Sequence, residues 1–251
     1  MIDHFKPPRG AVFSGKRIAK SEQMQRLAKG RVRVPKWTFL EANRSYSEAE
    51  WGRFVIVKPN AWGVASHGRG IELVRTSSLK HRAPALYPEN HPGRLGHMLV
   101  QKFIDTGPHS EDYRVVSIFG RALYALRRKS LVEIEDLDAT GRNSTSVGIV
   151  SNAQSGPRDV GYCYDEDVLA MAAATYRAIP EVGFQAIDVR REKGTGRLYC
   201  LEINPGGNTW NFSSPRARAI PTIDGIRRED QLGAWKIAAE ALVEKTRLFA
   251  S

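Results

Sequence analysis

The sequence contains little cysteine and no long apolar run. Its two cysteines, Cys163 and Cys200, do not make a disulfide framework, and their spacing does not match a metal site. No apolar segment approaches the ~18–20 residues that cross a bilayer. The N-terminus, MIDHFKPPRG, lacks the apolar core of a signal peptide. We therefore expect a cytoplasmic protein without a membrane partner, in which Cys200 is a small packing residue.

Acidic residues are scarce relative to basic ones. The chain has 27 Asp and Glu against 38 Lys and Arg, which gives a formal net charge of +11. Such a balance favours an anionic partner, which can be a phosphate-bearing ligand, an acidic peptide or a nucleic acid. The basic residues are spread along the chain, and a solvated face explains most of them. Because no stacked-aromatic or recognition-helix pattern accompanies them, a nucleic-acid-binding protein is the least favoured interpretation.

The chain has neither internal repeats nor a low-complexity tail, and its 251 residues can bury a large core. Apolar runs bounded by turns predict strands over residues 54–59, 71–74, 98–104, 113–119 and 122–128. Apolar periodicity predicts helices over residues 14–30, 165–179 and 229–249. Residues 105–112 and 133–160 are predicted to be polar connections. The pattern predicts an α+β fold with mostly antiparallel sheets in two lobes, residues 1–100 and residues 101–251.

The most informative segment is a predicted hairpin over residues 183–208, GFQAIDVRREKGTGRLYCLEINPGGN. Asp188 and Glu202 lie inside its two apolar strands, and Asn204 follows the second carboxylate closely. A carboxylate in such a place is costly unless a positive charge neutralises it. The hairpin therefore calls for a cation near these side chains.

The spacing within the hairpin brings its oxygen-bearing side chains together. Glu202 and Asn204 are two residues apart, so they point to the same face of an extended chain, where Asp188 of the partner strand can join them. Three such ligands suit Mg²⁺, with phosphate oxygens and waters completing the shell. The competing interpretation is an ordinary hairpin with a solvent-facing polar side.

A second motif combines a lysine with a glycine-bearing loop. The strand FVIVKP ends with Lys58, and residues 63–70, GVASHGRG, follow it. Glycines let backbone N–H groups approach an anion closely, and Arg69 adds a positive charge. The motif is neither a Walker loop nor a dinucleotide fingerprint. A glycine loop between two strands suits folding over phosphates as a lid, and the alternative is an ordinary hairpin loop.

The apolar strand VQKFI, residues 100–104, leads into a polar loop. Exposed backbone groups at its end can read the edge of an adenine base, with Phe103 and Ile104 in apolar contact. The alternative is a strand that belongs only to the core.

Taken in order, these segments resemble the ATP-grasp superfamily of carboxylate–amine and carboxylate–thiol ligases. The resemblance covers residues 14–214, roughly four fifths of the chain. FVIVKP and SHGRGI resemble the strand, lysine and phosphate-covering loop of that family, and LVQKFI resembles its hinge. EDYRVVSIFGRALYALRRKS resembles the strand pair after the hinge, and FQAIDV with LEINPGGN resembles the metal-binding end. The pattern Asp…Glu-x-Asn-Pro, with Asp188 and Glu202 14 positions apart, is the most specific element.

The resemblance implies an ATP site. Its residues would be Lys58, Ser66, Gly68, Arg69, Gly70, Gln101, Lys102, Phe103, Ile104 and Asp112. Lys58 would contact the α- and β-phosphates, Gln101 the amino edge of adenine, and Asp112 the ribose hydroxyls. Main-chain groups around Lys102 and Ile104 would bind the base.

The resemblance also implies a metal site and a catalytic arginine. Asp188, Glu202 and Asn204 would hold one or two Mg²⁺ ions, or Mn²⁺, with Glu202 bridging. Arg127 or Arg128 would face the transferred phosphoryl group. Because neighbouring residues of a strand point to opposite faces, only one of the two can do so, and we favour Arg128.

The reaction that the resemblance implies is ADP-forming ligation. A carboxylate attacks the γ-phosphate of ATP to give an acyl phosphate, and an amine or thiol then displaces phosphate. An amino acid or a peptide is the expected substrate. Residues 205–211, PGGNTWN, would contact the acceptor, and the alternative for them is a glycine-rich turn with Trp210 in the core.

Two features depart from the family pattern. Ala186 stands where relatives similar to D-alanine–D-alanine ligase carry an arginine two residues before the first metal-binding aspartate. Only about a dozen residues precede the first predicted helix, whereas most family members have an extra N-terminal domain that helps to hold the substrate. We therefore expect the two lobes, the basic surface, a second copy or a partner chain to hold it. A nucleotide-binding regulatory or scaffold module without activity is the alternative function.

Overall fold

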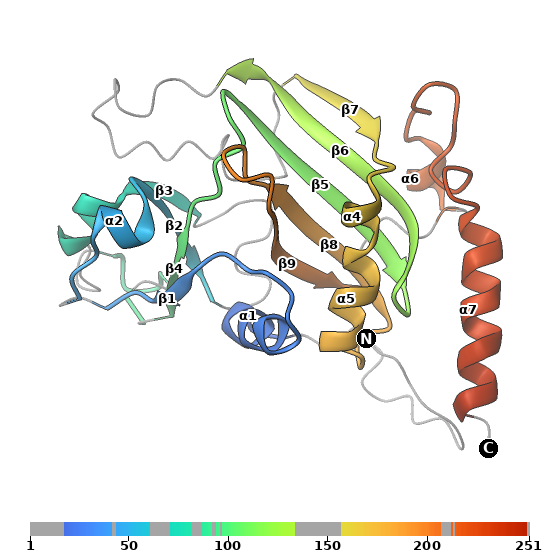
Figure 1. Ribbon diagram of the computed structural model, residues 1–251, viewed down its shortest axis with the longest axis horizontal. Coiled ribbons are helices and arrows are strands. Elements are labelled where there is room, and N and C mark those ends of the chain that lie inside the picture. Colours follow the sequence, from blue (N-terminus) through green and yellow to red (C-terminus); the bar gives the residue numbers. More distant parts are fainter. Residues whose placement is uncertain are drawn as a thin grey trace.

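The computed structural model describes residues 18–41, 44–60, 71–81, 87–91, 94–95, 97–133, 157–206, 212 and 214–249. Two sheets make up the fold, and Figure 1 shows them side by side. The strand order is β1-β4-β2-β3 in the four-stranded sheet and β7-β6-β5-β8-β9 in the five-stranded sheet. Every strand pair is antiparallel. The predicted α+β fold with antiparallel sheets is therefore confirmed.

The four-stranded sheet is formed by β1 (Trp37–Phe39), β2 (Phe54–Pro59), β3 (Glu72–Arg75) and β4 (Met98–Lys102). Alternate residues of β2 are buried, because Val55 and Val57 point into a core that also holds Trp51. The short helix α2 (Glu48–Trp51) and the 3-10 helix η2 (Thr76–His81) adjoin this sheet. Its inner strands carry Lys58, which lies near the charge of Glu202 in the second sheet, and Gln101, which contacts Met24 of the first helix.

The five-stranded sheet is formed by β5 (His109–Ile118), β6 (Arg121–Glu133), β7 (Arg158–Tyr162), β8 (Phe184–Arg191) and β9 (Leu198–Pro205). Strand alternation gives it two different faces. Val115, Ile187 and Val189 point into one apolar core, whereas Val116 and Ala186 point into another on the opposite side. The charged residues that alternate with Val115, Ile187 and Val189 therefore lie on the same face of the sheet as Val116 and Ala186.

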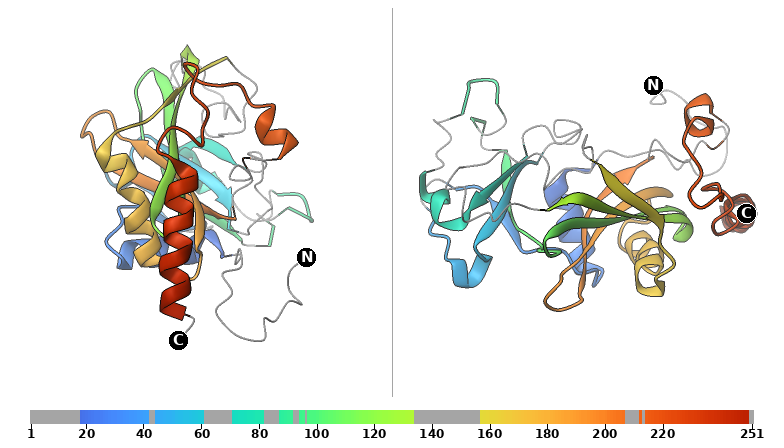
Figure 2. Two further views of the ribbon diagram at one scale, coloured as in Figure 1. Left: turned by 90° about the vertical axis from the view of Figure 1, so that its right-hand side faces the viewer. Right: turned by 90° about the horizontal axis from the view of Figure 1, so that it is seen from above.

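Helices cover both faces of the five-stranded sheet. On one face lie α1 (Lys20–Lys29), α4 (Glu166–Leu169) and α5 (Met171–Ala178), and on the other lie α6 (Pro215–Arg218) and α7 (Ala234–Phe249). The view from above in Figure 2 shows α1 and α5 on one side of the sheet and α6 on the other. Although α1 precedes the first sheet in the chain, it packs with α5 against the second. The division into residues 1–100 and 101–251 stays a prediction.

Several element boundaries differ from those that the sequence predicts. The helix predicted over residues 165–179 is two helices, α4 and α5, joined at Ala170. Strand β5 begins at His109, within the predicted loop, and the last helix begins only at Ala234. The sequence pattern misses β1 and the edge strand β7. For β7 (RDVGY) the reason is its composition, because the strand has charged residues, a glycine and a largely exposed side. Residues 14–17 of the first predicted helix lie outside the described residues.

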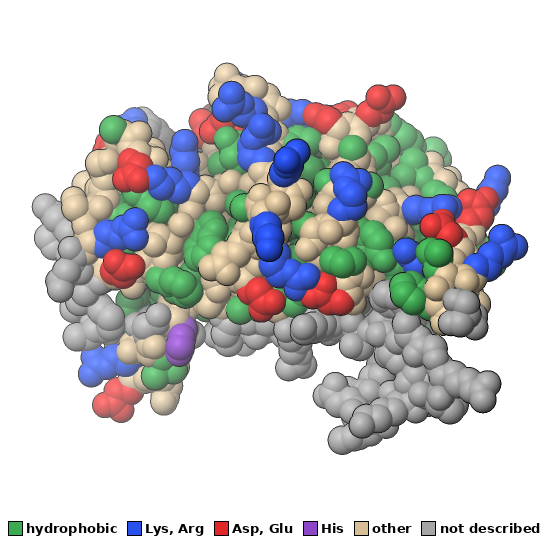
Figure 3. All heavy atoms as spheres, turned by 60° about the horizontal axis from the view of Figure 1, so that its bottom comes forward, with side chains coloured by type: hydrophobic (Ala, Val, Ile, Leu, Met, Phe, Trp, Pro, Cys, Tyr) green, Lys and Arg blue, Asp and Glu red, His purple; other side chains and the backbone are tan. Residues whose placement is uncertain are grey.

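Charges of both signs are interleaved on the surface. Figure 3 shows Lys and Arg side chains scattered over one face, several of them next to Asp or Glu. Ion pairs account for part of this arrangement: Arg191 contacts Asp165 and Asp167, and Arg26 contacts Glu181. In the part of the chain that the structure describes, no helix is long and apolar enough to cross a membrane.

We predict that Gly30→Ala destabilises the protein by about 1–3 kcal/mol, the usual cost of overpacking. Gly30 ends α1 with a φ of −77°, which any residue can adopt, but an added Cβ would lie 2.6 Å from the Cβ of Ala178 in α5. Urea unfolding measures the change. Gly161→Ala is the control, because its Cβ would meet nothing within 4 Å. Equal stability of the two variants would contradict the close packing of α1 on α5.

Candidate nucleotide and metal site

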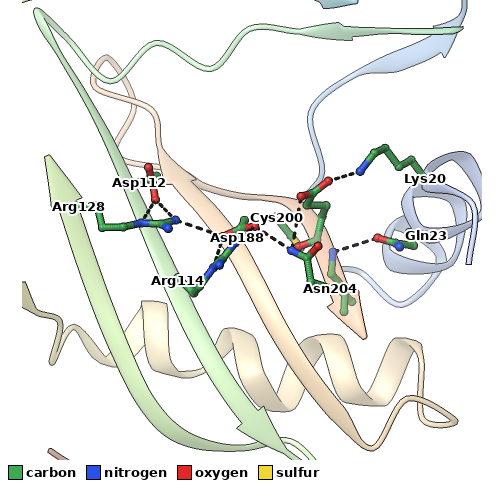
Figure 4. A network of polar contacts seen from close by, with 10 residues as sticks. Lys20, Gln23, Asp112, Arg114, Arg128, Asp188, Cys200 and Asn204 are labelled. Carbon is green, nitrogen blue, oxygen red and sulfur yellow. Dashed lines mark hydrogen bonds and ion pairs between the residues drawn. The ribbon is translucent and has the colours of Figure 1, made fainter. Parts of the chain in front are cut away.

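Charged side chains alternate across one face of the five-stranded sheet. The strand register places Arg128 opposite Asp112, Arg114 opposite Asp188, and Asp188 opposite Glu202. Adjacent strands lie only about 4.8 Å apart, so each carboxylate has a neighbouring charge within reach. Figure 4 shows the resulting network.

Asp188 is at the centre of this network, and its side chain is only 1% exposed. Arg114 binds it with two hydrogen bonds, in which Nε and Nη2 each donate to a different carboxylate oxygen at 2.8 Å. Nη2 of Arg128 donates to the same carboxylate at 3.3 Å. The Asp188 charge raises the pKa of Arg114. Two arginines thus provide the positive charge that a buried carboxylate requires.

Glu202 is bound by Lys20 at the start of α1, and its side chain is 26% exposed. Burial acts to raise the pKa of Glu202, but the charges of Lys20 and Lys58 outweigh this effect and lower it to about 2. Glu202 is therefore ionised at neutral pH. Burial, together with the neighbouring Lys20, lowers the pKa of Lys58 to about 8.

Asn204 joins the two carboxylates from the end of β9. Its Nδ2 donates to Asp188 at 3.0 Å and lies 3.5 Å from Oε1 of Glu202. The structure thus brings together the three residues that the sequence predicts as metal ligands. Gln23 of α1 holds this end of β9, because its Oε1 accepts a hydrogen bond from the Ile203 N–H at 2.9 Å.

These three residues fit a magnesium ion. Two carboxylates and an amide offer the hard oxygen donors that Mg²⁺ binds, provided that Asn204 turns its Oδ1 inward and Lys20 releases Glu202. Within the described ranges, no group of three His, Cys, Asp or Glu residues could hold a metal. A metal ion at this site would therefore need the amide of Asn204 as a third protein ligand.

The two candidate arginines point to opposite faces of β6. Arg128 lies within the network, where its Nε donates to Asp112 at 2.6 Å. Arg127 instead pairs with Asp159 of the edge strand β7, away from the metal residues. Since Arg128 uses the carboxylate of Asp112, the ribose-binding role of Asp112 stays a prediction.

At the predicted hinge, two main-chain donors are already used by neighbouring segments. The N–H of Lys102 donates to Lys36 at 2.8 Å, and that of Phe103 donates to Phe54 at 3.4 Å. Gln101 is buried, and its Nε2 lies 3.7 Å from the sulfur of Met24. Ile104 is also buried. The contacts of these residues with adenine stay a prediction.

Four residues of the predicted phosphate-covering loop, Ser66, Gly68, Arg69 and Gly70, lie outside the described residues. The segment that leads into this loop is tied to α1. Asn60 accepts hydrogen bonds from the N–H of Lys20 at its carbonyl and from the N–H of Ser21 at its Oδ1. This contact brings Lys58 of the first sheet and Lys20 to the carboxylates of the second.

Sequence reasoning missed three cations near this site. Arg114 was detectable, because it is two residues from Asp112 and therefore shares its face of the strand. The same alternation places Arg190 on the face of Asp188, and its guanidinium lies 5.7 Å from the ring centre of Phe103. Lys20 gives no such signal, because only the folding of α1 onto β9 brings it to Glu202.

Cys200 is fully buried, as predicted, and burial raises the pKa of its thiol.

We predict that Arg114→Met lowers the free energy of unfolding by about 3 kcal/mol. Breaking a buried ion pair usually costs about 3–5 kcal/mol. We expect the lower end of this range, because Arg128 still contacts Asp188 in the variant. Arg127→Met is the matched control, since its pair with Asp159 is exposed and contributes about 1 kcal/mol or less. Urea unfolding of both variants is the measurement, and equal losses would show that Asp188 does not depend on Arg114.

No family model and no curated protein matches the sequence. Solved structures are similar to it at low sequence identity. A complex of the ATP-grasp ligase PsnB with a minimal precursor is 16% identical, with a TM-score of 0.53 over 91% of this chain and 61% of PsnB. D-alanine–D-alanine ligase from Bacillus anthracis is 16% identical, with a TM-score of 0.55 over 91% of this chain and 68% of that one. D-cycloserine synthetase DcsG is 17% identical, with a TM-score of 0.53 over 87% of this chain and 70% of that one.

The chain spans about three fifths of the length of PsnB. The similarity extends over both sheets, since it covers most of this chain in each comparison. Together with the ordered motifs of the sequence, it shows that this chain has the fold of the ATP-grasp ligases.

Proposed function

We propose that the protein is an ATP-dependent, ADP-forming ligase that activates a carboxylate for attack by an amine or a thiol. The observation that carries the proposal is the buried charge network on one face of the five-stranded sheet. It combines the carboxylates of Asp112, Asp188 and Glu202 with four cations, Lys20, Lys58, Arg114 and Arg128. Such a site suits a metal-bound triphosphate.

In this proposal each part of the site has one task. Lys58 and Lys20 bind phosphate oxygens, and Lys20 leaves Glu202 when it does so. Asp188, Glu202 and Asn204 hold one or two Mg²⁺ ions, for which Mn²⁺ can substitute. When bound, Mg²⁺ neutralises phosphate charge and polarises the transferred group. The hinge at Gln101–Ile104 is the proposed adenine site.

The chemistry needs no nucleophile from the protein. A carboxylate oxygen of the substrate attacks the γ-phosphorus, the bond to the β-phosphate oxygen breaks, and ADP leaves. The amine or thiol then attacks the carbonyl carbon of the acyl phosphate and expels inorganic phosphate. Arg128, from within the network, stabilises the charge on the transferred phosphoryl group. Positioning and charge neutralisation are what phosphoryl transfer requires of a protein.

An amino acid or a peptide is the proposed substrate. PsnB has been solved with a precursor peptide and AMPPNP, at 18% identity and a TM-score of 0.50. D-alanine–D-alanine ligase has been solved with ATP. The peptide complex belongs to PsnB, and it supports the same substrate class here, whereas the ATP complex supports only the nucleotide. A second copy of the chain or another protein is proposed to help hold the substrate.

The second candidate function is nucleotide binding without turnover. The ion pairs favour it, because Lys20 and Arg114 already neutralise Glu202 and Asp188 without a metal ion. This candidate predicts that Mg²⁺-ATP raises the melting temperature, whereas no substrate causes ADP release. The ligase predicts the same rise in melting temperature and, in addition, ADP release.

We predict that the purified protein releases ADP and phosphate from Mg²⁺-ATP when it receives an amino-acid or peptide carboxylate together with an amine. Glu202→Gln should lower this rate by at least about tenfold, since loss of a metal ligand should cost no less than the roughly 10–100-fold lost with one of its hydrogen-bonding partners. Glu192→Gln is the control, because Glu192 lies in the exposed turn of the same hairpin. If Glu202→Gln turns over as fast as the wild type, the metal assignment is wrong.

We predict that Lys58→Met raises the dissociation constant of Mg²⁺-ATP by about tenfold or more, the usual effect of losing a hydrogen bond to a charged group. The variant should still fold, because replacing a buried ammonium with an apolar chain removes a desolvation cost. Calorimetric titration is the measurement. Lys36→Met, at an exposed ion pair with Glu50, should bind ATP like the wild type. Unchanged affinity in Lys58→Met would place the triphosphate elsewhere.

A further inference from the structure

Both carboxylates of the proposed metal site are engaged by cations of the protein itself. Glu202 is paired with Lys20, and Asp188 is paired with Arg114. The amide of Asn204 turns its Nδ2 toward both carboxylates. A divalent ion that binds Glu202 therefore has to displace the ammonium group of Lys20.

Lys20 is held less rigidly than the arginine. Arg114 lies on the strand beside Asp188 and donates two hydrogen bonds to it, each at 2.8 Å. Lys20 reaches Glu202 from α1, and its side chain is 12% exposed (Figure 4). A lysine presents a point charge on a flexible four-carbon stem, whereas a guanidinium binds a carboxylate with a rigid fork. Lys20 is therefore the cation that moves away more readily.

The backbone around Lys20 is fixed while its side chain can rotate. The N–H of Lys20 donates to the carbonyl of Asn60, just beyond β2, at 3.1 Å. In the next turn of α1, Oε1 of Gln23 accepts a hydrogen bond from the N–H of Ile203 in β9 at 2.9 Å. The start of α1 is thus tied to both sheets. Rotation of the Lys20 side chain alone can release Glu202.

Lys58 adds a reason for Lys20 to turn toward phosphate. Burial, together with the charge of Lys20, lowers the pKa of Lys58 to about 8, because the two ammonium groups lie near each other. An anion between them relieves this repulsion, and a triphosphate gives Lys20 a partner in exchange for Glu202. Free Mg²⁺ offers no such exchange, and it loses its hydration water reluctantly.

We propose that Lys20 competes with divalent metal ions for Glu202, so that a metal binds strongly only together with a nucleotide. The phosphates take over Lys20, and the metal replaces it at the carboxylate. Because metal and nucleotide are coupled through this lysine, each raises the affinity of the protein for the other. This inference rests on the proposed ATP site and concerns how that site is filled.

The test is calorimetric titration of Mn²⁺ into the protein without nucleotide. Lys20→Met removes the competing charge and keeps most of the alkyl stem. We expect this variant to bind Mn²⁺ at least about tenfold more tightly than the wild type, which corresponds to the loss of one hydrogen bond between charged groups. Lys20→Arg retains the charge and should bind Mn²⁺ as weakly as the wild type. Lys29→Met is the matched control, because Lys29 is exposed at the other end of the same helix.

Two further measurements locate the effect. The gain in Mn²⁺ affinity should disappear when Lys20→Met is combined with Glu202→Gln, since Glu202 is the ligand that the first change sets free. Mn²⁺ should also raise the melting temperature of Lys20→Met more than that of the wild type, because a ligand that binds the folded state more tightly stabilises it more.

Three results would overturn the proposal: equal Mn²⁺ affinity of Lys20→Met and the wild type, an equal gain in Lys29→Met, or a gain that survives Glu202→Gln. The first result, with a lower melting temperature that Mn²⁺ does not restore, would make Lys20 a purely structural link between α1 and β9. Failure of Mg²⁺-AMPPNP to bind the wild type would instead overturn the ATP-dependent function. The Mn²⁺ titrations test the competition at Glu202 without any nucleotide, so the two failures are distinguishable.

Discussion

The candidate site depends on the carboxyl group of Asp188, which lies inside a sheet with almost no access to water. An isolated carboxylate there would be far too costly, so the surrounding strands must supply positive charge. Antiparallel register does this directly, because it places Arg114 opposite Asp188 and brings Arg128 within reach from the next strand. The network is therefore a property of strand pairing, and its geometry is set when β5, β6 and β8 pair.

A second constraint joins the two sheets. The start of α1 is tied by its backbone to Asn60, which directly follows β2 of the first sheet, and by Lys20 to Glu202 of the second sheet. Through this contact, Lys58 of the first sheet lies near the carboxylate of Glu202 in the second sheet. The contact also explains why α1 packs with the second sheet although it precedes the first in the chain. A ligand that draws Lys20 away from Glu202 would act on the junction between the sheets.

Much of this arrangement could be predicted from the sequence, wherever it follows from alternation along a strand. The pairing of Glu202 with Asn204, their convergence with Asp188, and the opposite directions of Arg127 and Arg128 all follow from this rule. Contacts between α1 and the sheet could not be predicted. Lys20 reaches Glu202, and Gln23 reaches Ile203, only because α1 folds onto β9. Strand β7 was missed for a related reason, since an exposed edge strand has no apolar pattern to reveal it.

The central claim is that a metal-bound nucleotide occupies this face of the five-stranded sheet. Nuclear magnetic resonance with Mn²⁺ in place of Mg²⁺ tests it most directly, because the paramagnetic ion broadens the signals of nearby amides. In the presence of ATP, Mn²⁺ should broaden the amide signals of Asp188, Glu202 and Asn204 first, and those of the outer edge strand around Asp159 much less. Broadening that spares the hairpin, or that is unchanged when ATP is omitted, would contradict the account.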